Sequence, residues 1–182
     1  MPSSQTDLFT IQVVHSAAIS EALRGEIISL CIRAYEENLQ ALYETFDSPT
    51  HVLGYCDEIL VSHAMWVTRY LQPGNLQPLR TAYVELVATH PDYRQRGFAS
   101  SIMKRLVGEI LDYDLAALSP FSVEYYGRLG WEAWRGPLFI RADGKILSTP
   151  ADERVMIYRL PKTPPLDLNA PLSAEWRAWE LW

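Results

Sequence analysis

The stretch from Val84 to Lys104 (VELVATHPDYRQRGFASSIMK) is the part of this sequence that most constrains the fold. A run of β-forming residues ends at His90, a short polar turn follows, and apolar residues at helical spacing begin after Gly97. Backbone N–H groups at a helix start lack partners and carry partial positive charge, so a phosphate binds there readily. Gly97 lets a ligand approach the backbone closely. The stretch predicts a pyrophosphate site, although an exposed basic turn alone is an equally simple reading.

The rest of the chain alternates between helical and strand periodicity. The pattern predicts strands at 8–15, 51–55, 59–70, 79–90, 116–119, 138–141 and 155–160, and helices at about 23–34, 36–45, 97–110 and 122–129. Strands 51–55 and 59–70 are expected to form an antiparallel hairpin. Gly130 is expected to end the last helix in a left-handed conformation, and a turn at Asp143-Gly144 to separate the last two strands. The element order predicts an α/β mixture around one central sheet.

Composition limits the class of protein. The length of 182 residues fits one domain, and no run of eighteen apolar residues predicts a membrane span. The N-terminus does not resemble a signal peptide, and two cysteines favour a reduced, cytoplasmic setting. The net charge of −6 argues against a nucleic-acid partner and suits a cationic one. No Cys/His spacing suggests zinc, so no metal is expected.

The segment 161–182 differs from the rest of the chain. Its four prolines are expected to prevent regular structure. Three of the six tryptophans of the chain nevertheless lie in its last seven residues (WRAWELW). Because disordered tails are poor in aromatic residues, we expect this segment to pack back on the domain, near the substrate site.

The motif at residues 86–99 (LVATHPDYRQRGFA) resembles the acetyl-CoA-binding motif of the GCN5-related N-acetyltransferase (GNAT) superfamily. Residues 83–85 (YVE), 117–119 (ALS), Tyr126 followed by Gly130-Trp131, and the tryptophan-rich end look like the aminoglycoside 2'-N-acetyltransferases. The resemblance implies a single domain over residues 1–182, of the α/β (α+β) class, with a mixed, mostly antiparallel sheet flanked by helices. It also implies acetyl-CoA as co-substrate and a small cationic amine as partner.

The resemblance further implies roles for individual residues. Glu85 matches the general base, acting through water, and Tyr126 the general acid. The Val87 N–H matches the donor to the thioester oxygen. The residues expected at the cofactor are Val87, Ala88, Thr89, Arg94, Gln95, Arg96, Gly97, Phe98, Ala99 and Ser100. Those expected at the substrate are Glu36, Glu37, Glu85, Ser119, Glu180 and the terminal carboxylate of Trp182.

Several alternatives remain open from the sequence. The amine can belong to a conventional aminoglycoside, to kasugamycin, to another small amine or to a peptide N-terminus. A non-catalytic acyl-CoA-binding module is a further alternative, against which the presence of both Glu85 and Tyr126 argues. No membrane partner is expected, and a homodimer is suggested by analogy with the resembled group.

Overall fold

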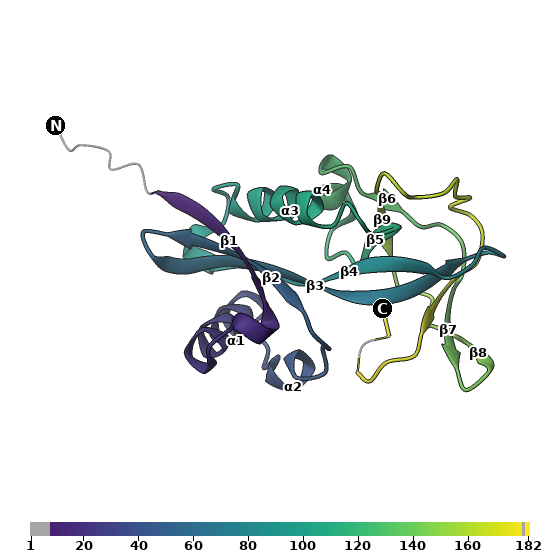
Figure 1. Ribbon diagram of the computed structural model, residues 1–182, viewed down its shortest axis with the longest axis horizontal. Helices are drawn as coiled ribbons and strands as arrows, with labels where there is room; N and C mark the ends of the chain where they lie inside the picture. Colours follow the sequence, from purple (N-terminus) through teal and green to yellow (C-terminus); the bar gives the residue numbers. More distant parts are fainter. Residues whose placement is uncertain (1–7, 180) are drawn as a thin grey trace. The chain divides into compact units, whose positions relative to one another are not determined.

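The computed structural model describes residues 8–179, 181 and 182 (Figure 1). Backbone contacts divide the chain into two compact units. The first comprises residues 1–65 and 86–106, and the second residues 66–85 and 107–182. The long strands β3 (Ile59–Pro73) and β4 (Leu79–Thr89) each contribute one part to each unit.

The first unit begins with β1 (Phe9–His15), a 3-10 turn (Ser16–Ala18), α1 (Glu21–Tyr35) and α2 (Gln40–Tyr43). Strand β2 (Thr50–Cys56) pairs with β1 in antiparallel register and also with β3. The connection between β2 and β3 has Asp57 and Glu58 at φ 47° and 69°. Two consecutive left-handed residues are typical of the tight turns that join paired strands, as the sequence predicted here.

Helices cover both faces of the strands in the first unit. Figure 1 shows α1 and α2 on the face opposite to α3 (Phe98–Glu109). On the α1 face the buried cluster comprises Ile27, Leu30, Cys31, Leu39, Leu42, Tyr43, Leu53, Leu60, Met65, Leu86 and Ala88. On the α3 face a Cβ at Gly54 would lie 2.7 Å from the Phe9 ring and 3.1 Å from Ile102. The glycine at this position therefore lets Phe9 of β1 and Ile102 of α3 pack closely against β2.

The second unit contains the remaining strands and one helix: β5 (Leu115–Leu118), α4 (Val123–Arg128), β6 (Glu132–Ala133), β7 (Leu138–Ala142), β8 (Lys145–Ser148), β9 (Met156–Arg159) and β10 (Leu172–Glu175). Strand β5 pairs in parallel with β4 and antiparallel with β9, which also pairs with β6. Strand β10 is antiparallel to β3 and parallel to β7, which forms a hairpin with β8. The sheet is therefore mixed and mostly antiparallel, as predicted.

Two local features define the ends of α4, the helix that the sequence predicted at 122–129. The Ser122 hydroxyl accepts a hydrogen bond from the Tyr125 N–H at 3.1 Å, which caps the start of the helix. Gly130 adopts φ 90° just after the helix ends.

Three expectations from the sequence are wrong. The helix predicted at 36–45 is only the single turn of α2, because Glu36 ends α1 as a left-handed cap with φ 59°. The Asp143-Gly144 turn joins β7 to the unpredicted strand β8, whereas β9 pairs with β5. The prolines after residue 160 do not exclude regular structure, since β10 begins directly after Pro171, where the missing N–H lies outside the strand.

Candidate active site

The turn between β4 and α3 has an unusual backbone. Residues Pro91–Tyr93 form one turn of 3-10 helix, and His90 Nδ1 accepts a hydrogen bond from the Asp92 N–H. Gln95 and Gly97 then adopt left-handed conformations with φ 63° and 81°. A Cβ added to Gly97 would meet no protein atom within 4 Å, so the space in front of it is open. This geometry fits the pyrophosphate of acetyl-CoA, which needs close backbone approach at the start of a helix.

The two arginines of this turn differ in their surroundings. Arg94 Nη2 donates a hydrogen bond to the carbonyl of Ala34, near the end of α1, at 2.8 Å. The Arg96 guanidinium lies over the Tyr93 ring, 4.9 Å from its centroid. Arg94 therefore ties the turn to α1, a structural role beside the cofactor role that the sequence suggested. Next to it, Phe98, Ala99 and Ser100 are half-buried in the first turn of α3.

The end of β4 departs from the regular alternation expected from the sequence. Leu86 has φ 49°, a left-handed conformation that a branched side chain adopts only where its surroundings impose it. The Leu86 carbonyl lies 2.8 Å from His63 Nδ1, and the Val87 carbonyl accepts a hydrogen bond from the Tyr35 hydroxyl at 3.1 Å. Thr89 Oγ1 lies 2.9 Å from the Ser62 hydroxyl. The Ser62 hydroxyl also donates to the Ala88 carbonyl at 3.2 Å. Side chains of the first unit thus hold the segment 86–89, of which residues 87–89 are expected at the cofactor.

In the second unit the predicted base Glu85 has a partner that the sequence analysis missed. Arg177 Nη1 donates to Glu85 Oε1 at 2.5 Å, and only 9% of Glu85 is exposed. The same guanidinium lies 5.3 Å from the centroid of the Tyr83 ring. The Tyr83 hydroxyl is fully buried and has no hydrogen-bond partner among the described residues. The Glu85 carboxylate is nearly buried, and a buried charge requires a nearby counter-ion, which Arg177 supplies.

Arg69 anchors the C-terminal segment. This residue is 2% exposed, and its side chain donates to the Glu175 carbonyl at 2.8 Å, the Glu175 carboxylate at 3.4 Å and the Leu181 carbonyl at 2.9 Å. It also lies 4.8 Å from the Tyr83 ring and 6.0 Å from the Trp182 ring. Trp182 itself is 2% exposed. The last residue is therefore packed in the second unit, against the arginine that holds the preceding carbonyl.

Tyr126, the predicted acid, is buried in a group of aromatic rings. Its ring centroid lies 5.4 Å from Phe121, 5.0 Å from Tyr125 and 6.2 Å from Trp131. Burial, followed by the neighbouring Tyr125, raises the pKa of Tyr126 above its ordinary value. The phenol is thus protonated at neutral pH, which is the state that an acid requires.

The acetyltransferase (GNAT) domain family matches residues 19–134, well over half of the chain. The chain belongs to the GNAT family of acetyltransferases. A relative from Mycolicibacterium fortuitum, aminoglycoside 2'-N-acetyltransferase, is 30% identical over 96% of this chain and 93% of its own length.

Solved structures of GNAT proteins share the fold. YhbS from Escherichia coli in complex with CoA has a TM-score of 0.65 at 15% identity and covers 94% of this chain and 91% of its own. Eis1 from Mycobacterium abscessus has a TM-score of 0.61 at 17% identity over 71% of this chain. This chain spans only 32% of the length of Eis1 and 33% of the length of a probable N-acyltransferase from Enterococcus faecalis V583.

The other residues predicted at the substrate of this GNAT acetyltransferase lie in varied places. Glu36 and Glu37 are exposed at the end of α1, and Ser119 is exposed directly after β5. Glu180 lies outside the described residues. Within residues 8–179, 181 and 182, no group of three or more metal-ligating side chains occurs, and no helix is long and apolar enough to span a membrane.

Proposed function

We propose that this GNAT acetyltransferase transfers an acetyl group from acetyl-CoA to the 2'-amine of an aminoglycoside. The observation that carries the proposal is the 30% identity, over nearly the whole chain, to a protein named for that reaction. The buried carboxylate of Glu85 supports it, because the substrate is a polycation whose amine must lose a proton. The burial of Trp182 in the second unit supports it as well, because the resemblance places this residue at a substrate amine.

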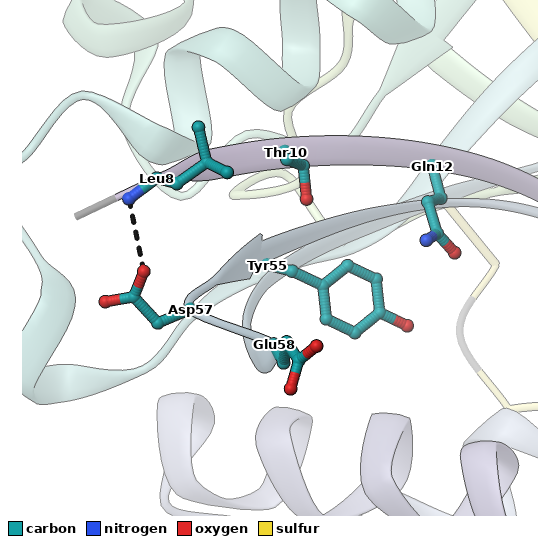
Figure 2. Close-up of a pocket in the computed structure, with 6 residues that line it drawn as sticks. All are labelled: Leu8, Thr10, Gln12, Tyr55, Asp57 and Glu58. Carbon is teal, nitrogen blue, oxygen red and sulfur yellow. Dashed lines mark hydrogen bonds between the residues drawn. The ribbon is translucent and has the colours of Figure 1, made fainter.

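The first unit supplies the proposed cofactor residues. The N–H groups of residues 95–100 bind the pyrophosphate, with Arg96 adding charge, and Gly97 leaves room for the phosphate oxygens. The backbone at Val87 and Thr89 hydrogen-bonds the pantetheine arm. Figure 2 shows a different hollow of this unit, lined by Leu8, Thr10, Gln12, Tyr55, Asp57 and Glu58. None of its residues belongs to the proposed cofactor set.

The proposed chemistry is direct transfer. The neutral amine nitrogen attacks the thioester carbonyl carbon, so that a C–N bond forms and the carbonyl oxygen gains negative charge, which the Val87 N–H stabilises. The C–S bond then breaks. Glu85 removes the proton of the amine through water, Tyr126 protonates the leaving thiolate, and the products are the N-acetyl amine and free CoA.

A matched pair of antibiotics tests this proposal. Kanamycin B carries an amine at the 2' position, where kanamycin A carries a hydroxyl. We expect the protein to release CoA thiol from acetyl-CoA with kanamycin B and not with kanamycin A, and Glu85→Gln to abolish that release. Kasugamycin tests the smaller substrate class. Equal turnover of both kanamycins would contradict acetylation at the 2' position, and no turnover with any of the three would contradict the aminoglycoside assignment.

A further inference from the structure

A chain of buried hydrogen bonds links β2, β3 and the left-handed residue of β4. His51 Nδ1 lies 3.0 Å from His63 Nε2, and His63 Nδ1 lies 2.8 Å from the Leu86 carbonyl oxygen. Both histidines are 0% exposed. Cys31 Sγ, from α1, lies 3.8 Å from His63 Nδ1, and the Tyr43 ring stacks on His51 with centroids 5.9 Å apart. All of these residues lie in the first unit.

The geometry fixes which nitrogen of each histidine carries a proton. The Leu86 carbonyl can only accept, so His63 Nδ1 must donate to it. In neutral His63 the other nitrogen, Nε2, is then an acceptor, and His51 Nδ1 must donate to it. His51 Nε2 is left as a buried acceptor without a partner among the described residues. In the neutral form of both rings the proton is therefore on Nδ1.

This hydrogen bond controls a backbone group of the proposed active site. The peptide between Leu86 and Val87 is planar and trans, so its C=O and its N–H point in opposite directions. Once His63 holds the Leu86 carbonyl, the direction of the Val87 N–H is set. The Tyr35 hydroxyl fixes the next carbonyl, that of Val87, at 3.1 Å. Both peptides that flank Val87 are thus held by side chains of the first unit.

We propose that His63, oriented by His51, is a positioning residue that aims the Val87 N–H at the thioester oxygen. The inference rests on the proposed function, in which Val87 is the donor to that oxygen. It explains why two histidines are buried together on neighbouring strands. It also explains why Leu86 is left-handed, since the hydrogen bond to His63 offsets the backbone strain.

Two substitutions of His63 separate positioning from folding. In His63→Asn the side-chain amide nitrogen can replace Nδ1 as donor, whereas His63→Leu has a similar size and no donor. Removing a donor to such an oxygen lowers kcat by about 100- to 1000-fold. In His63→Leu the Val87 N–H is still present but is no longer aimed at the oxygen, so we expect a smaller loss. The expected decrease in kcat is about 10- to 100-fold, with the KM for acetyl-CoA changed less than about threefold. His63→Asn should recover most of the loss.

Leu30→Ala is the matched control. Leu30 belongs to the buried cluster that includes Tyr43 and Leu86, and truncation of its side chain weakens packing without removing a member of the hydrogen-bonded chain. We expect it to lower the melting temperature and to leave kcat within about twofold. A kcat as low in Leu30→Ala as in His63→Leu would mean that general loosening of the core explains the effect, and it would overturn the inference.

A spectroscopic measurement tests the inference without relying on turnover. In the wild-type protein, the ¹⁵N shifts of the ring should show His63 protonated on Nδ1, and addition of acetyl-CoA should shift the Val87 amide resonance. In His63→Leu the protein should still bind acetyl-CoA but lose that shift. A proton on His63 Nε2, or an unchanged Val87 response in His63→Leu, would overturn the inference. If acetyl-CoA binds and Val87 responds but no amine is acetylated, the proposed function fails while the positioning role stands.

Discussion

The buried histidine pair predicts a specific loss of stability in mild acid. Burial lowers the pKa of His51 to about 4 and that of His63 to about 3, from 6.5, and a second histidine adds to the effect in each case: His15 for His51, and His51 for His63. Besides these rings, the titratable groups that face the pair are Cys31 and Tyr43, with His15 acting on His51 at longer range. Burial raises the pKa of the Cys31 thiol to about 12 and also raises that of Tyr43. Neither group therefore changes charge in acid.

The sign follows from proton binding. Because both folded pKa values lie below 6.5, the unfolded chain binds more protons than the folded protein as the pH falls through that value. The contribution of the two histidines to the free energy of unfolding is therefore complete above about pH 7 and decreases as the pH falls below that value. Between pH 7 and pH 5 each buried histidine costs about 2 kcal/mol, because the unfolded chain takes up its protons mostly below pH 6.5, and the pair costs about 4 kcal/mol.

The assay is urea unfolding at pH 7 and pH 5, compared between the wild-type protein and the double variant His51→Gln/His63→Asn. Carboxylates contribute to the acid response of both proteins equally, so the difference isolates the histidines. We expect the wild-type free energy of unfolding to fall by about 4 kcal/mol more than that of the variant. Equal losses in the two proteins would refute the assignment of two neutral, buried histidines.

Four further substitutions test other parts of the structure. Arg69→Met removes the partner of two carbonyls and a carboxylate, so we expect the free energy of unfolding, measured in urea, to fall by about 3 kcal/mol or more, and an unchanged value would contradict the anchoring role of Arg69. Tyr83→Phe removes a buried hydroxyl without a partner among the described residues, and a melting temperature that falls by more than a few degrees would contradict that reading. Gly97→Ala places a Cβ at φ 81° and should cost about 1–2 kcal/mol and raise the KM for acetyl-CoA, whereas an unchanged KM would exclude close cofactor approach there. Tyr126→Phe should lower kcat about 100-fold or more in steady-state assays if the phenol is the acid, and a kcat equal to that of Tyr125→Phe would assign the role elsewhere.

The sequence predicted well those elements whose signals are local. The β4–turn–α3 segment has a strand pattern, a glycine at a left-handed position and a helical stripe, and all three occur within twenty-one residues. The hairpin at Asp57-Glu58 and the left-handed Gly130 after α4 likewise depend on neighbouring residues. Such features need no knowledge of distant pairing.

Features that depend on long-range pairing were missed. Strand β10 is too short to show a pattern, and it exists because β3 and β7 flank it. Arg177 meets Glu85 across 92 positions of sequence. Likewise, the histidines of β2 and β3 carry no mark that predicts their contact with Leu86, although two histidines inside apolar strands are a signal worth testing in similar sequences.

The position of the acetyl group on the product tests the central proposal most directly. Kanamycin B is incubated with the protein and acetyl-CoA labelled with ¹³C at the carbonyl carbon, and the product is examined by two-dimensional NMR. The account predicts a coupling between the labelled carbonyl and the proton at the 2' carbon, with no labelled product from kanamycin A. A label on any other nitrogen of kanamycin B would contradict it.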